Sequence, residues 1–186
     1  MKRNRHEFPI VLQAYLDEKD AWGTEFGAWV FGRINLELLN QSDGTLVPID
    51  YSGLTRSDVS FQREAVVETL RKHRPKLLFI ARGLTDPDIR ENLALALEKR
   101  GEALLVADDP FHPTVLGKRL SAEQFTTLEK AWSEGRVAST TFADLNLSTA
   151  SSRLTTLWRA GLLERVEGTS PSGGREHRYY SIRVSG

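Results

Sequence analysis

The sequence predicts an α/β protein in which a mixed sheet with packed helices precedes a smaller unit of helices and a β-hairpin. Strand-like and helix-like segments alternate through residues 8–107, and such alternation is typical of a sheet covered by helices. The last third of the chain has a different order, in which helix-like segments precede two strand-like ones. We therefore expect two domains, residues 1–117 and 118–186.

Composition limits the classes of site that the chain can hold. Of the 186 residues, 40% are hydrophobic and 9% aromatic, which favours a packed core. The absence of cysteine excludes disulfides and thiolate sites, and the four histidines lack the spacing of metal ligands. We expect no metal and no cofactor. No apolar run approaches the ~20 residues that span a bilayer, and no hydrophobic signal core follows the basic N-terminus. We therefore expect a cytoplasmic protein that does not enter a membrane.

Apolar periodicity assigns the elements of the first domain in order. Strands are expected at residues 8–16, 45–50, 77–81 and 104–107, and helices at 24–40, 60–72 and 87–101. The side chains expected to face inward from these helices are Phe26, Trp29, Val30, Ile34 and Leu38, then Phe61, Ala65, Val66, Thr69 and Leu70, then Ile89, Leu93, Ala96 and Leu97. Asp86 is expected to cap the third helix, which Pro87 begins and Gly101 ends.

A linker and one further helix are expected between the two domains. Two prolines and a glycine interrupt the alternation at residues 110–117 and predict a connection without regular structure. Ser121 then caps a helix in which Phe125, Leu128, Ala131 and Trp132 recur on one side. We expect Trp132 to lie in the core rather than against a partner subunit.

The segment from residue 141 onward predicts two helices and a hairpin. A short helix at 141–145 is followed by a run that Ser148 is expected to cap, with Leu147, Ala150, Leu154 and Leu157 on one side and Gly161 at its end. Strands at 163–167 and 177–184 flank a glycine-rich loop. From Ser148 onward there are six arginines and three glutamates, in a chain whose net charge is zero.

The other side of the second helix carries short hydroxyls and arginines, which suit a helix lying in a major groove. The glycine-rich loop would let the backbone approach a second point of the duplex. A purely solvated helix surface is the alternative interpretation. The candidate DNA-binding residues are Ser148, Thr149, Ser152, Arg153, Thr155, Thr156 and Arg159 on the helix, and Gly173, Gly174, Arg175 and Arg178 at the hairpin.

Residues 121–184 resemble the winged helix-turn-helix domains of bacterial transcriptional regulators. The stretches Leu-Ser-Thr-Ala-Ser-Ser-Arg-Leu at 147–154 and Arg-Ala-Gly-Leu-Leu-Glu-Arg at 159–165 carry most of the resemblance. It implies double-stranded DNA as the partner, with the second helix in the major groove and the hairpin wing on the flanking backbone. Because one such module reads only a short site, we expect a homodimer.

Residues 8–107 resemble the STAS-like domains of bacterial proteins, which are regulatory or protein-interaction modules. The resemblance rests on Leu-Val-Pro-Ile-Asp-Tyr-Ser-Gly-Leu at 46–54, on Ser60-Phe61 at a helix start, and on Ala-Leu-Ala-Leu-Glu-Lys-Arg at 94–100. It implies a possible phosphoacceptor serine in the loop after the second strand, with Ser57 and Ser60 as candidates. The alternative is that Ser60 only caps the helix and the other hydroxyls satisfy turn backbone.

Together these features favour a DNA-binding transcriptional regulator whose first domain modulates or dimerises the second. The alternative is a signalling module in which the STAS-like domain binds a kinase-like or other protein partner. A third hypothesis, an enzyme acting through Asp50, Ser57 and Asp108, lacks a recognisable base and nucleophile pair. We therefore expect no catalytic residues.

Overall fold

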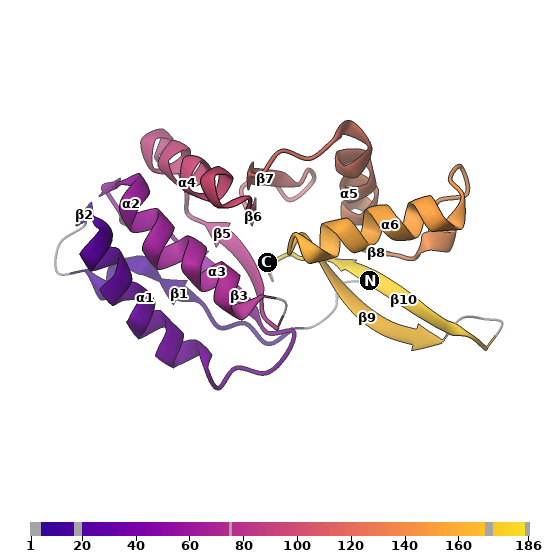
Figure 1. Ribbon diagram of the computed structural model, residues 1–186, viewed down its shortest axis with the longest axis horizontal. Coiled ribbons are helices and arrows are strands. Elements are labelled where there is room, and N and C mark those ends of the chain that lie inside the picture. Colours follow the sequence, from indigo (N-terminus) through magenta and orange to yellow (C-terminus); the bar gives the residue numbers. More distant parts are fainter. Residues whose placement is uncertain (1–4, 17–19, 75, 170–172, 185–186) are drawn as a thin grey trace.

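The computed structural model describes residues 5–16, 20–74, 76–169 and 173–184. It contains two units arranged along the longest axis of the molecule (Figure 1). The first has a five-stranded sheet of order β1-β3-β5-β6-β7, and the second has a three-stranded antiparallel sheet of order β8-β10-β9. The predicted mixed α/β class is thus confirmed.

The first unit alternates strands and helices. Strands β1 (Ile10–Val11), β3 (Leu46–Asp50), β5 (Leu78–Arg82) and β6 (Ala103–Val106) are parallel, and β7 (Thr114–Gly117) is antiparallel to β6. The helices are α1 (Thr24–Leu38), α2 (Val59–Phe61), α3 (Glu68–His73) and α4 (Pro87–Arg100). The π-helical segment η2 (Gln62–Val67) joins α2 to α3, the 3-10 helix η1 (Leu12–Tyr15) follows β1, and β2 (Asp20–Ala21) pairs with β4 (Arg56–Ser57).

Four expectations for this unit are corrected. The strand expected at 8–16 is only two residues long, because the chain turns into η1. Asp58, not Ser60, caps α2, since its side chain accepts a hydrogen bond of 2.8 Å from the backbone nitrogen of Phe61. The expected linker contains β7, which pairs along the whole of β6 and covers an edge that would otherwise present unpaired backbone groups. Trp29, expected inside, is 52% exposed.

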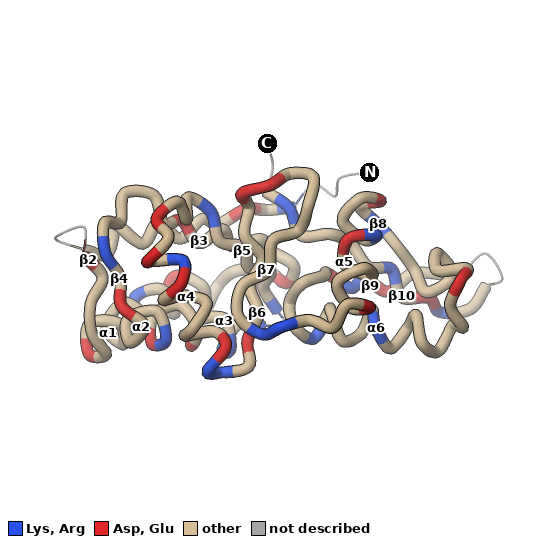
Figure 2. The backbone as a smooth tube through the Cα atoms, turned by 90° about the horizontal axis from the view of Figure 1, so that it is seen from above, with Lys and Arg blue, Asp and Glu red and all other residues tan. Residues whose placement is uncertain are grey.

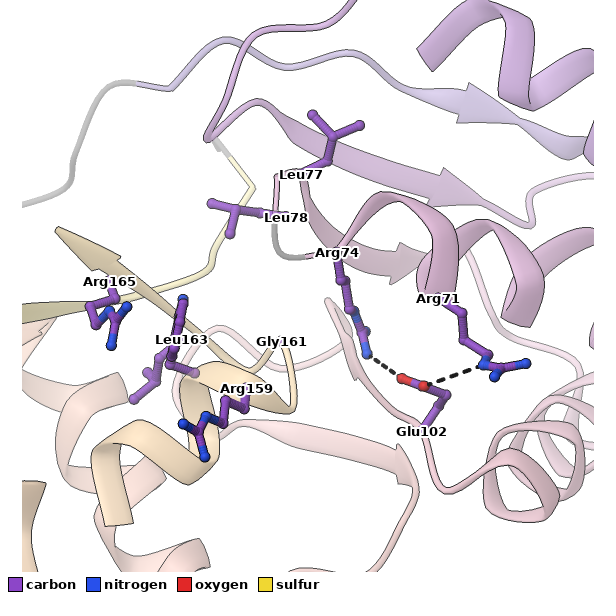
Figure 3. A pocket seen from close by; sticks show the side chains of 10 residues that line it. Arg71, Arg74, Leu77, Leu78, Glu102, Arg159, Gly161, Leu163 and Arg165 are labelled. Atoms are coloured by element: carbon purple, nitrogen blue, oxygen red, sulfur yellow. Dashed lines mark hydrogen bonds and ion pairs between the residues drawn. The ribbon is translucent and has the colours of Figure 1, made fainter. Parts of the chain in front are cut away.

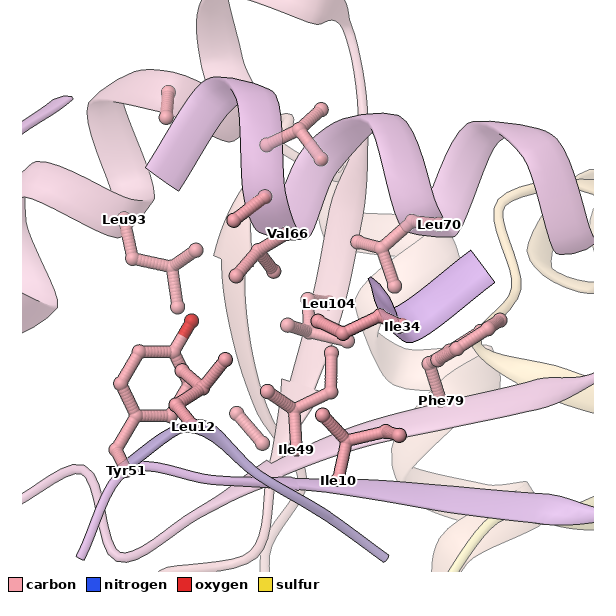
Figure 4. Close-up of a cluster of buried hydrophobic side chains, with 14 of the residues drawn as sticks. Ile10, Leu12, Ile34, Ile49, Tyr51, Val66, Leu70, Phe79, Leu93 and Leu104 are labelled. Carbon is pink, nitrogen blue, oxygen red and sulfur yellow. The ribbon is translucent and has the colours of Figure 1, made fainter. Parts of the chain in front are cut away.

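All helices of this unit lie on one face of its sheet (Figure 1). The parallel strands follow one another in space in the order in which they occur in the chain, and right-handed crossovers then place every connecting helix on the same side. Val47, Ile49, Phe79 and Leu104 point into the core under these helices. Figure 4 shows this core, in which helix residues such as Ile34 and Leu70 meet the strand side chains.

The opposite face of the sheet is apolar as well. Leu46, Leu78, Ile80, Ala103 and Leu105 alternate with the residues under the helices, and all are buried. They belong to one buried cluster with side chains of the second unit, including Trp132, Leu154, Leu157 and Leu163. Since parallel sheets require cover on both faces, the second unit supplies the layer that the helices leave out.

The second unit consists of α5 (Ala122–Glu134), β8 (Arg136–Val137), the 3-10 helix η3 (Ser139–Thr141), α6 (Leu147–Arg159), β9 (Leu163–Thr169) and β10 (Arg175–Ser181). Ser121 caps α5, as predicted, and forms a capping box with Gln124. Gly161 has φ +71° and ends α6, also as predicted.

Local details of this unit differ from expectation. The helix expected at 141–145 is replaced by η3 and a turn. Asn146, not Ser148, caps α6, because its Oδ1 accepts a bond of 2.8 Å from the backbone nitrogen of Thr149. Leu147 consequently lies in the first turn outside the core and is 60% exposed. Phe125 is likewise at the surface, whereas Trp132 is buried as expected.

Two arginines of the first unit reach across to the second. The Arg5 guanidinium donates to Glu164 Oε2 at 2.8 Å and to the Ser181 carbonyl at 2.9 Å. Arg74 donates to the Ala160 carbonyl at the end of α6 and to the Ala103 carbonyl of β6. These bonds and the shared apolar cluster hold the two units in one arrangement.

Candidate nucleic-acid interface

Helix α6 runs from the far end of the second unit toward the first unit (Figure 1). Ala150, Leu154 and Leu157 form its buried side. The opposite side is exposed and carries four short hydroxyl side chains, which we call the hydroxyl face of α6: Ser148, Ser151, Ser152 and Thr156. Sequence reasoning omitted Ser151, although helical spacing places it one turn from Ser148 and from Thr155.

Three of the predicted helix residues lie beside this face rather than on it. Thr155 is partly buried, with its hydroxyl 3.2 Å from the hydroxyl of Tyr179 on β10. Thr149 and Arg153 are partly buried on the other side. The pKa of Glu123, at the start of α5, is lowered by a hydrogen bond from Ser121, and the Arg153 charge adds to that shift. The Arg153 charge thus acts on the start of α5.

Arg159, the last residue of α6, is exposed but lies where the helix meets the first unit. It lines a cleft with Arg71, Arg74 and Arg165, which we call the interunit cleft. The structure thus separates Arg159 from the N-terminal half of the hydroxyl face by about two helical turns.

The hairpin candidates divide into two kinds. Gly173, Gly174 and Arg175 are exposed at its end, and Gly173 has φ +85°, a conformation that favours glycine. Residues 170–172 of the predicted tip lie outside the described residues. Arg178 lies along the hairpin, where it donates to the Thr169 carbonyl at 2.9 Å and approaches Glu176 at 3.7 Å. Its charge is therefore partly neutralised by groups within the hairpin.

Charge is not concentrated on one face of the whole molecule. Figure 2 shows acidic and basic residues interleaved along both units, in keeping with the net charge of zero. Any attraction to an anionic partner must therefore come from local groups, such as Arg175 at the hairpin and the arginines of the interunit cleft.

The candidate phosphoacceptors lie in different surroundings. Ser57 is 3% exposed, and its Oγ accepts a bond of 2.8 Å from Gln62, whose side-chain oxygen accepts in turn from Tyr51. This burial disfavours Ser57 as a target for a kinase. Ser60 is partly exposed in the first turn of α2.

The carboxylates of the enzyme hypothesis are each engaged by an arginine. Asp50 lies 2.9 Å from Arg82, and Asp108 lies 2.9 Å from Arg90. Burial opposes ionisation of Asp50, but its bonds from Ser52 and Arg82 outweigh this effect and lower its pKa. Among the residues described, there is no group of three or more acidic or histidine side chains placed to hold a metal ion.

Comparison with known proteins does not assign this chain to a family. No family model, curated protein or solved structure matches the chain.

Within the described ranges, no helix has the length and apolar character needed to cross a bilayer.

Proposed function

We propose that this protein is a transcriptional regulator that binds double-stranded DNA through α6 and the β9–β10 hairpin. The order of elements from α5 to β10, helix, strand, short turn of helix, helix and hairpin, supports a winged helix-turn-helix interpretation of the second unit. The first unit, with its sequentially ordered parallel strands, fits the STAS-like regulatory module that the sequence resembles.

The observation that carries the proposal is the hydroxyl face of α6. A surface of short side chains lets a helix approach a duplex closely, and serine and threonine hydroxyls bond to phosphates and base edges. This face is exposed although the buried side of the same helix is fully enclosed. The end of α6 that carries Ser148 lies on the side away from the first unit, as do the end of β9 and the start of β10 (Figure 1).

The hairpin supplies the second contact of the proposed interface. Arg175 is exposed beside two glycines, which allow the backbone to approach a phosphate or a minor groove. Arg178 contributes less, because it is bonded within the hairpin. Two copies of the chain would bind a palindromic site, and sedimentation at micromolar concentration tests that dimer.

The first experiment introduces a negative charge on the hydroxyl face. Ser152→Glu places a carboxylate where a phosphate backbone would lie, and like charges across an interface cost several kcal/mol. We expect the affinity for duplex DNA to fall by about tenfold or more, measured by fluorescence anisotropy on pooled genomic fragments. Ser133→Glu is the control, since it adds the same charge at an exposed site on α5.

A second experiment compares the two hairpin arginines. Arg175→Ala should reduce the slope of log affinity against log salt by about 0.9, the value for one lost phosphate contact. Arg178→Ala should change it less. If Ser152→Glu and Arg175→Ala both bind DNA like the parent while remaining folded, the second unit does not read DNA in this way, and the protein-interaction alternative is favoured.

A further inference from the structure

The interunit cleft has the size of a site for a small molecule. It has a volume of about 540 Å³. One side is formed by α3, the segment leading into β5 and Glu102 before β6, and the other by the corner between α6 and β9. Sites for small ligands typically have volumes of about 300–1,000 Å³. Figure 3 shows that the cleft draws its lining from segments far apart in the sequence.

The lining carries a strong local excess of positive charge. Four arginines, Arg71, Arg74, Arg159 and Arg165, and a single acidic residue, Glu102, line the cleft, which leaves three positive charges. The whole chain has a net charge of zero. Such a concentration of guanidinium groups is costly unless an anion offsets their repulsion.

Glu102 cannot satisfy all of these arginines. It lies 3.0 Å from Arg74 and 3.9 Å from Arg71 (Figure 3). Glu68 also forms an ion pair with Arg71. Within the part of the chain that the structure describes, neither Arg159 nor Arg165 forms an ion pair. The Nε of Arg74 is also buried without a hydrogen-bond partner among these residues.

Two of the arginines are held in fixed positions with their charge retained, which favours binding of an anionic ligand. The Arg165 guanidinium lies over the ring of Trp158, 3.4 Å from its centre, which holds the planar group in place. Arg74 is fixed by three acceptors, and burial lowers its pKa to about 10, against the opposing effect of Glu102, so it stays charged at neutral pH. The side chains of Leu77, Leu78 and Leu163 are buried behind the cleft, and the partly exposed Trp158 ring is its apolar surface.

We infer that the interunit cleft binds a small phosphorylated molecule. Guanidinium groups donate paired hydrogen bonds that match phosphate oxygens, and the partly exposed Trp158 ring offers apolar surface to the rest of such a ligand. Because Arg74 bonds both Ala160, which follows α6, and Ala103 of β6, a ligand held beside it would contact both units at once. The site stands independently of DNA binding, which the test does not involve.

The test is calorimetric titration of the full chain with inorganic pyrophosphate, AMP and ATP at low ionic strength and without DNA. We expect binding of at least one of these probes and a melting temperature that rises with its concentration. Arg159→Gln and Arg165→Gln should each weaken that binding by about tenfold or more, the effect of losing a charge-assisted hydrogen bond.

Arg33→Gln is the matched control. Arg33 is an exposed arginine that lies over Trp29 on α1, so its replacement removes the same charge from an arginine–tryptophan contact that does not line the cleft. Arg159→Gln should leave the chain folded, because Arg159 is exposed, so a loss of binding in this variant reports on the cleft. Failure of all three probes to bind at about 10 mM would overturn the inference. Binding that the two cleft variants leave unchanged would overturn it equally.

Discussion

Replacing Ile80 by alanine tests whether the two units share one core. Ile80 is fully buried on the face of β5 that the second unit covers, in the cluster that contains Trp132 and Leu157. Truncating a buried isoleucine costs about 2–5 kcal/mol. With a urea dependence of about 1–3 kcal/mol per molar, a loss near 3 kcal/mol should lower the unfolding midpoint by roughly 1–3 M.

The assay follows the second unit alone. The chain has four tryptophans, of which Trp22 and Trp29 belong to the first unit and are exposed. Changing both to phenylalanine leaves Trp132 and Trp158 as fluorescence reporters of the second unit, while circular dichroism follows the whole chain. We expect Ile80→Ala, made in the first unit, to lower both midpoints together.

A control and an opposite result define the test. Leu36→Ala, at an exposed position of α1, should change the free energy of unfolding by no more than about 0.5 kcal/mol, whether dichroism or fluorescence is followed. If Ile80→Ala lowers the dichroism transition but leaves the tryptophan transition unmoved, the two units unfold independently and the shared-core argument is wrong.

Three further changes probe local features. Gly161→Ala should destabilise the protein by about 1–3 kcal/mol, because Gly161 has φ +71° and an added Cβ would lie 2.5 Å from Arg74 Nε; thermal melting measures this. Asp58→Ala should cost about 1–2 kcal/mol in urea unfolding through loss of the α2 cap. Burial lowers the pKa of His73, assisted by Lys72 and Lys76, so stability should be full above the unfolded pKa near 6.5 and fall as pH decreases below it.

Each of these changes has its own control. Gly32→Ala, within α1 and with open space around the added Cβ, should be neutral or stabilising, and an equal loss at both glycines would contradict the steric argument. Ser60→Ala should lower the free energy of unfolding only slightly. A loss as large as that of Asp58→Ala would indicate that Ser60, not Asp58, caps α2. The fall in unfolding midpoint between pH 7.5 and 5 should be smaller in His73→Gln, and an unchanged fall would exclude His73 as its source.

Signals that act within a few residues could be read from the sequence alone. The start and end of α4 follow from Asp86, Pro87 and Gly101, whose effects on the backbone need no distant partner. The end of α6 at Gly161 and the cap of α5 at Ser121 are of the same kind. The inward residues of α4 were also predicted, because helical periodicity places them on one side.

Competition between neighbouring caps was beyond the sequence, because several polar residues near a helix start satisfy the same rule. Asp58 and Ser60, or Asn146 and Ser148, differ only in where the helix begins, and tertiary packing decides that. The edge strand β7 was missed for a related reason. A strand of four residues next to two prolines becomes a strand only where β6 offers a backbone edge.

What the sequence by itself determined was the mixed α/β class, the order of the longer helices and strands, and the inward side of helices such as α4 and α6. Only the tertiary structure decided what covers each face of the five-stranded sheet: the helices on one side and the second unit on the other. It also brought Arg71 and Arg74 beside Arg159 and Arg165 from segments about 90 residues apart. Periodicity reports whether a side chain is buried, but the partner that buries it depends on contacts between distant segments, which no local pattern records.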